Sequence, residues 1–220
     1  MSEVLSPPSE AFPALSALKG IRHAFTLRVP GVDVKVDREE ALKRLDEAHA
    51  ICRRALGVES KTFVTGRQVH GRDVAVVDSR TTKVVPDVDG LITADPQVCL
   101  GVYVADCCPV YFADPKRQVI GLAHSGRKGS ELGIARATLD RMQSAFGCNP
   151  GDVVVQLGPC IRPPHYEIDF APLIVAQCRE AGVREVHDCG VCTACHPERY
   201  YSYRLELGKT GRMLALLALE

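Results

Sequence analysis

Three residues of metal-binding types stand far apart in the sequence: His70 in GRQVHG, Cys107 in VADCCPV and His124 in GLAHSG. Imidazole nitrogen and thiolate sulfur are donors that zinc prefers, and a zinc ion held by three side chains keeps a further position for water or substrate. Compact zinc fingers draw their ligands from closely spaced motifs. The wide spacing therefore predicts a catalytic site that several strands assemble.

Each of these residues also has an ordinary structural interpretation when it is taken singly. A histidine beside glycine commonly lies in a surface turn, and a cysteine at a strand end commonly packs as a small apolar side chain. The prediction of a metal site therefore depends on the convergence of all three.

The secondary structure that must position these residues is built by a chain of 220 residues, of which 46% are hydrophobic and 25% are charged. This length and composition predict one domain over residues 21–220, preceded by a Pro- and Ser-rich arm over residues 1–20 that we expect to be loosely ordered. Lys plus Arg and Asp plus Glu each total 27. This balance favours a small-molecule ligand over nucleic acid or a membrane surface, and we expect a monomer or a small homo-oligomer.

The sequence also indicates the compartment. Its first residues have neither the basic opening nor the apolar centre of a secretory signal, and no run of apolar residues is long enough for a membrane span. We therefore expect a cytoplasmic protein, in which the ten cysteines remain reduced and serve as core residues, metal ligands or nucleophiles.

Periodicity predicts mixed strands and helices. Apolar side chains recur at three- and four-residue steps over residues 38–56, which indicates a helix ended by Gly57. A turn at residues 114–116 predicts a hairpin. We expect strands over residues 62–65, 73–78, 98–104, 109–113, 119–123 and 152–157, helices over 132–146 and 171–181, and an ambiguous apolar segment over 213–219. The predicted fold class is α/β (α+β), with mixed β-sheets sandwiched between helices.

Six motifs occur in one order along the chain: QVHG, DGLIT, ADCCPVYFADP, AHSG, GPCIRPPHYEI and CTACHPERYYSYRLELGKTGRM. Over roughly residues 62–219 the chain resembles the YfiH family, known as laccase-domain or polyphenol oxidase proteins and as purine nucleoside phosphorylases with adenosine deaminase activity. The resemblance implies a YfiH-like domain in which His70, Cys107 and His124 bind zinc. It selects Cys107 because this residue follows Asp106 directly, and strand alternation leaves Cys108 for packing.

The resemblance implies a zinc-dependent phosphorylase for nucleosides such as adenosine, inosine, guanosine and methylthioadenosine, with adenosine deaminase as a side activity. Zinc lowers the pKa of a bound water to about 7, which permits attack on C6 of adenine. We assign catalytic roles to Cys107, His124 and Asp106. Asp106 and Asp89 are both candidates for the proton shuttle that deamination needs, although Asp89 and Gly90 also fit a simple turn.

Phosphorolysis requires an anion site beside the nucleoside. The segment HSGRKGS predicts one, because glycines admit backbone N–H groups to an anion and a helix follows. We assign substrate binding to Gly126, Arg127 and Lys128; the alternative is a turn with Ser130 as N-cap. The family motif HAGWRG reads HSGRKG here, so Arg127 replaces Trp and Lys128 replaces Arg. The family's SLNLG-like loop is also absent from residues 25–40, and we therefore expect a changed substrate range.

A cysteine cluster near the end of the sequence, Cys189, Cys192 and Cys195 followed by His196, has spacing compatible with a second zinc site. A structural zinc normally draws a further ligand pair from later in the chain, and none follows His196. The resemblance instead implies fold elements near the active site.

Three alternative functions remain open. One is a copper-dependent polyphenol oxidase. Seven histidines are few for an enzyme with several copper centres, and the only candidates for an axial ligand, Met142 and Met213, fall in apolar stripes. Another is a metal-free hydrolase with Cys107 as nucleophile and His124 as base, acting on amides such as cell-wall peptide precursors. The third is a zinc-stabilised binding module.

Overall fold

Two six-stranded sheets form the centre of the computed structural model, which describes residues 8–220. The first sheet has the order β1 (Ser9–Glu10), β2 (Ile21–Thr26), β12 (Met213–Leu219), β7 (Val98–Val104), β3 (Thr62–Gly66) and β5 (Val84–Val85). The second has the order β11 (Glu185–Asp188), β10 (Val154–Leu157), β8 (Cys108–Asp114), β9 (Val119–Ser125), β6 (Gly90–Thr93) and β4 (Val74–Val76). Each sheet combines parallel and antiparallel pairs.

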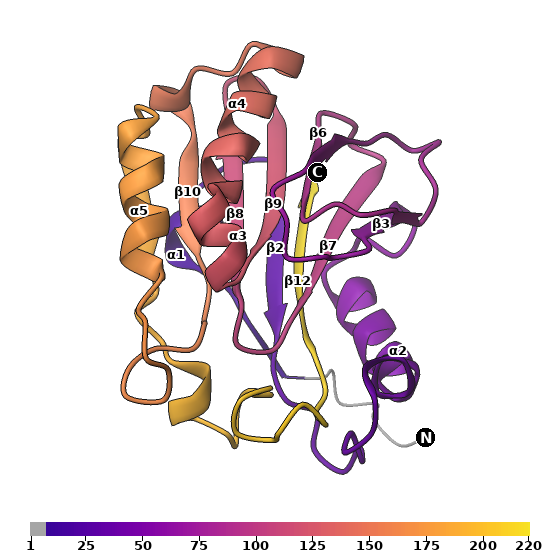
Figure 1. The fold of residues 1–220 in the computed structure, drawn as a ribbon. Coiled ribbons are helices and arrows are strands. Elements are labelled where there is room, and N and C mark those ends of the chain that lie inside the picture. The colour runs from indigo at the N-terminus through magenta and orange to yellow at the C-terminus, as the bar shows by residue number, and fades with distance from the viewer. Residues whose placement is uncertain (1–7) are drawn as a thin grey trace.

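The sheets face one another and helices cover their outer faces (Figure 1). Side chains such as Leu100, Leu217 and Tyr111 fill the core between the sheets. On the second sheet, α4 (Ile134–Phe146) and α5 (Ala171–Glu180) enclose a separate core with β8 and β9. On the first sheet, α2 (Arg38–Ala55) lies against β3 and β7. This arrangement confirms the predicted mixed sheets between helices.

The predicted helix over residues 38–56 is confirmed as α2. Its N-cap, Asp37, accepts a hydrogen bond from the backbone N–H of Glu40, which satisfies one of the free donors at the start of the helix. Gly57 follows the helix with a φ of 71°, a conformation that glycine adopts without strain.

The predicted hairpin is also present, and it brings two parts of the site together. Asp114 pairs with Val119, and the Asp114 carboxylate accepts hydrogen bonds from the backbone N–H groups of Lys116 and Arg117 in the turn. The same register places His124 opposite Pro109. His124 in β9 therefore lies beside the start of β8, where Cys107 precedes the strand.

Two predictions require correction. The helix expected over residues 132–146 begins only after Gly133, whose φ of 81° separates α4 from a shorter helix, α3 (Arg127–Leu132). Ser130 therefore lies inside α3 and is not the N-cap of the expected helix. The expected loose arm is ordered over residues 8–20, which contain β1 and α1 (Pro13–Ser16) and bury Phe12 and Leu15. Apolar side chains hold this segment in the main core, while residues 1–7 lie outside the described residues.

The ambiguous segment 213–219 is a central strand, β12, with both faces buried, which explains its continuous apolar sequence. Among the residues that the structure describes, no helix has both the length and the apolar character required to cross a bilayer.

Candidate metal centre

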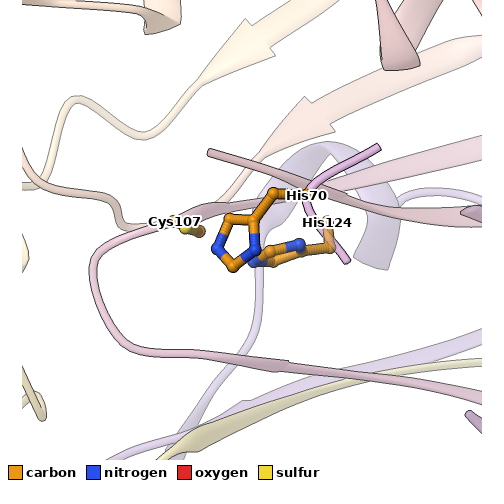
Figure 2. Close-up of side chains that lie close together, drawn as sticks. All are labelled: His70, Cys107 and His124. Atoms are coloured by element: carbon orange, nitrogen blue, oxygen red, sulfur yellow. The ribbon is translucent and has the colours of Figure 1, made fainter. Parts of the chain in front are cut away.

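His70, Cys107 and His124 come together at the junction of the two sheets (Figure 2). His70 follows β3, Cys107 lies between β7 and β8, and His124 belongs to β9. Their donor atoms lie within 4.8 Å of one another. Zinc–nitrogen and zinc–sulfur bonds of about 2.0–2.3 Å need only a small contraction of this set. The donor types and their spacing therefore fit one metal ion.

Asp89 orients the His124 ring. An Asp89 carboxylate oxygen lies 2.8 Å from Nδ1 of His124, and the backbone N–H of His124 donates to the Asp89 carbonyl at 2.7 Å. The side-chain contact leaves Nε2 of His124 available for a metal. Residue 89 was a candidate proton shuttle, and the structure places its carboxylate against Nδ1 of His124, a potential metal ligand.

The same carboxylate also fixes the loop of His70. It accepts hydrogen bonds from the backbone N–H groups of Val69, His70 and Gly71, at 3.1, 2.9 and 2.7 Å. Burial raises the pKa of the Asp89 carboxyl, but the hydrogen bonds from His124 and the backbone outweigh it and lower the pKa overall. His70 itself has a φ of 59°, a conformation that this bonded loop must maintain.

Cys107 and His124 form a polarised pair. Burial raises the pKa of the Cys107 thiol, but the charge of His124 and hydrogen bonds with both imidazoles lower it to about 6. Burial lowers the pKa of His124, but the charge of Cys107 and the bond to Asp89 raise it to about 9. The two groups therefore favour a thiolate beside an imidazolium in the metal-free pair. The thiolate is the form of cysteine that binds metals and attacks electrophiles.

Gly126 leaves the space that the ligands occupy. A Cβ atom at this position would lie 2.7 Å from Sγ of Cys107 and 3.3 Å from Cδ2 of His70. Real side chains do not approach so closely, so residue 126 must lack one for Cys107 to keep its position. The sequence assigned Gly126 to substrate binding, and the structure places it against Cys107 and His70, two of the potential metal ligands.

Asp106 precedes Cys107 and is bound to the C-terminal part of the chain. Its carboxylate accepts hydrogen bonds from Thr193 Oγ1 at 2.7 Å, Ser202 Oγ at 3.0 Å and the backbone N–H of Arg204 at 2.7 Å. The cysteine-rich segment predicted to lie near the site therefore reaches it through Thr193. Cys189 packs against the central core, Cys192 is buried and Cys195 is exposed.

A cavity of about 1230 Å³ opens onto the three ligands. Asp106 is the one acidic residue that lines it within the described part of the chain. Aromatic and cationic side chains form much of the wall: Tyr103, Tyr166, Phe170 and Tyr203, with Arg38, Arg127, Lys128, Arg204 and Arg212. The cavity therefore suits a flat ring that carries, or is accompanied by, negative charge.

Arg127 and Lys128 line this cavity, as a substrate-binding role requires. Arg127 lies 3.0 Å from Glu131 and 4.0 Å from Glu167, which hold part of its charge away from a ligand. Lys128 forms no ion pair with any residue from 8 to 220. It is therefore the freer cation of the two.

Several lining residues had no assigned role in the sequence analysis. Tyr203, Arg204 and Arg212 belong to the long motif CTACHPERYYSYRLELGKTGRM, whose polar and aromatic content was a usable signal. Tyr166 lies within the motif GPCIRPPHYEI, and Phe170 comes two residues after its end. Arg38 begins an ordinary amphipathic helix and offered no signal.

The chain is similar in sequence and in fold to several known proteins. The chain is 33% identical to a Deinococcus radiodurans protein named purine nucleoside phosphorylase, over 90% of this chain and 89% of the relative. It is 27% identical to human purine nucleoside phosphorylase LACC1, of which it spans 55%. The solved structure of YlmD from Geobacillus stearothermophilus has a TM-score of 0.78 and 26% identity, and the match covers 95% of this chain and 94% of that one.

A family model described as multi-copper polyphenol oxidoreductase laccase matches residues 23–171 and 166–220, nearly the whole of the described structure. The two matched segments contain all three potential metal ligands as well as the Thr193 segment that binds Asp106. The chain therefore belongs to the multi-copper polyphenol oxidoreductase laccase family.

Proposed function

We propose that this protein is a zinc-dependent purine nucleoside phosphorylase, acting on adenosine, inosine, guanosine or methylthioadenosine, with adenosine deaminase as a side activity. The observation that carries the proposal is the convergence of His70, Cys107 and His124 at the floor of a cavity lined by aromatic and cationic side chains. The names of relatives such as the Deinococcus radiodurans protein support the same reaction class.

His70, Cys107 and His124 would hold the metal. When bound, zinc supplies a Lewis acid that polarises oxygen groups and activates water near neutral pH. Zinc accepts two nitrogens and one sulfur with no further protein ligand, whereas a blue-copper centre adds a weak axial methionine. Met142 and Met213 are both buried in the cores, and Sδ of Met213 accepts a hydrogen bond from the Tyr201 N–H. The donor set therefore favours zinc.

The remaining side chains of the cavity have roles in substrate binding. Tyr166 and Phe170, with ring centroids 6.2 Å apart, offer aromatic surface to a purine. Lys128 and Arg127 supply positive charge for inorganic phosphate. Asp106 is the proton acceptor: its Oδ1 takes one hydrogen bond, from Thr193, which leaves an acceptor position free on that oxygen.

The test combines metal analysis with a nucleoside panel, assayed with and without phosphate. We expect about one zinc per chain, and release of free base that depends on phosphate. His124→Ala removes a ligand and should abolish both zinc binding and activity. His187→Ala, at an exposed histidine outside the cavity, is the matched control and should change neither. Full activity in zinc-free wild type would overturn the proposal.

The polarised Cys107–His124 pair favours a second candidate, a metal-free hydrolase of amides or esters. A thiol with a pKa of about 6 beside an imidazole is the nucleophile–base arrangement of such enzymes. Activity that survives chelation and is lost to a thiol alkylator would identify this mechanism. Activity that is lost to chelation and restored by zinc would exclude it.

A further inference from the structure

Arg212 is a buried cation that forms no ion pair with residues 8–220. It is 8% exposed, and its Nη1 donates to the carbonyls of Thr210 and Gly211, both at 2.8 Å. No carboxylate of residues 8–220 forms an ion pair with it. A buried charge is costly when it lacks a counter-charge, and backbone carbonyls offset only part of that cost. Because Arg212 lines the cavity, a bound anion could pair with it directly.

Arg38 lines the same cavity. It is the first residue of α2, it is exposed, and no described carboxylate pairs with it. Burial lowers the pKa of Arg212 and the positive charge of Arg38 lowers it further, whereas the charges of Cys107, Tyr203 and Asp106 raise it. An anion bound by both guanidinium groups would gain two charge-assisted hydrogen-bonding partners.

This pair is separate from the cations assigned to inorganic phosphate. Lys128 and Arg127 belong to α3, which follows β9 of the second sheet. Arg212 directly precedes β12 of the first sheet, and Arg38 belongs to the helix that covers that sheet. The volume of about 1230 Å³ exceeds the ~300–1000 Å³ typical of pockets for drug-sized ligands. The cavity therefore has room and charge for a second anionic group.

We propose that Arg38 and Arg212 form a second anion subsite, which binds a phosphoryl group carried by the nucleoside itself, so that purine nucleoside monophosphates are a substrate class of this protein. This inference rests on the proposed phosphorylase function. An oxygen of inorganic phosphate forms a bond to C1′ as the bond from C1′ to the base nitrogen breaks. The base leaves with that electron pair and takes up a proton, and the other product is a ribose bisphosphate.

The experiment compares adenosine with adenosine 5′-monophosphate, using zinc-loaded protein and saturating phosphate. We expect wild type to have the higher kcat/KM for the monophosphate. Arg38→Gln should lower kcat/KM for the monophosphate about tenfold more than for adenosine, as expected for the loss of one charge-assisted hydrogen bond. Arg54→Gln makes the same charge change on an exposed residue of α2 outside the cavity and should leave this ratio unchanged.

The possible failures are distinguishable. Equal kcat/KM values for the two substrates in wild type would overturn the second subsite and leave the phosphorylase function standing. A rise in KM for inorganic phosphate in Arg38→Gln, with adenosine as substrate and no change in the ratio, would assign the pair to the co-substrate and overturn the proposal.

If neither substrate releases base, the phosphorylase function itself fails, and calorimetry without phosphate still tests the subsite. Tighter binding of the monophosphate than of adenosine, lost in Arg38→Gln and kept in Arg54→Gln, would support the subsite. Equal binding of the two ligands by wild type would overturn it.

Discussion

The carboxylate of Asp89 lies 2.8 Å from Nδ1 of His124 and also accepts the backbone N–H of His70 at 2.9 Å. One buried acidic side chain therefore positions two of the three potential metal ligands, one through its ring and the other through its loop. Such partners set the tautomer and the direction of a metal-binding imidazole although they never touch the ion.

Replacing this carboxylate should weaken metal binding. Asp89→Asn removes the negative charge and turns an amide N–H₂ toward groups that are themselves donors. We expect zinc affinity to fall by about 10- to 100-fold, measured by competition with a chromophoric chelator. Asp87→Asn, at an exposed residue paired with Arg67, changes the same charge in the same segment and is the control. Equal affinities of the two variants would contradict this role of Asp89.

A methyl group behind Cys107 should displace its sulfur. Gly126 has a φ of −86°, so alanine is compatible with the backbone, and the predicted effect comes only from the contact of 2.7 Å with Sγ. We expect Gly126→Ala to lose stoichiometric zinc while circular dichroism shows a folded protein. In Gly151→Ala the new Cβ meets the end of the exposed Arg184 side chain, which can move away, and zinc content should be unchanged. Full zinc content in Gly126→Ala would show that the ligands tolerate the added methyl group.

Acid should destabilise the fold through two buried histidines, His23 and His49. Burial lowers the pKa of each to about 4, from the usual value of 6.5. Above pH 6.5 the two imidazoles are neutral in both the folded and the unfolded state, so the free energy of unfolding has its full value. As the pH falls from 6.5 toward 4, only the unfolded state gains the protons, so stability is lost over that window.

We expect a loss on the order of 2 kcal/mol per histidine between pH 6.5 and pH 5, measured by urea unfolding of chelated protein. His49→Gln cannot gain the proton in either state, so its stability should fall less on acidification than that of wild type. His187→Gln, at an exposed histidine, should keep the wild-type fall. The same fall in His49→Gln and wild type would refute the assignment.

Asp106 can be tested for proton transfer separately from its role in the fold. Asp106→Asn keeps the shape of the side chain but cannot accept a proton, and we expect deamination to fall by about 10²–10⁴-fold. Thr193→Val removes one of the three hydrogen bonds to the same carboxylate and leaves the carboxylate in place. It should cost about 1–3 kcal/mol of stability and retain most of the activity. Similar activities of the two variants would assign Asp106 a structural role alone.

Much of the fold followed from local sequence patterns. The stripe of α2 and the alternation and turn of the β8–β9 hairpin are short-range features, which the sequence expresses directly. The division of the helix at Gly133 and the packing of residues 8–20 were not predictable, because a single glycine and a Pro- and Ser-rich segment are compatible with either outcome. Tertiary contacts through Phe12 and Leu15 decided the second case.

The sequence predicted the site only where the residue type itself identifies a side chain as a potential metal ligand. His70, Cys107 and His124 carry that information, and the order of the motifs identified them as a set. The position of Asp89 behind His124 depends on the pairing of β6 with β9, a contact between distant segments that no local pattern encodes. The same limit applies to Arg38, which enters the cavity from a helix with an ordinary surface pattern.

The place of β12 between β2 and β7 determines when the first sheet can be completed. Residues 21–26 and 98–104 emerge from the ribosome before residues 213–219, so these two strands remain without their shared neighbour until residues 213–219 have been synthesised. Thr193, Ser202 and Arg204, which bind the residue next to Cys107, are also synthesised after both strands. The surroundings of Cys107 are therefore complete only after these later segments have been added to the nascent polypeptide.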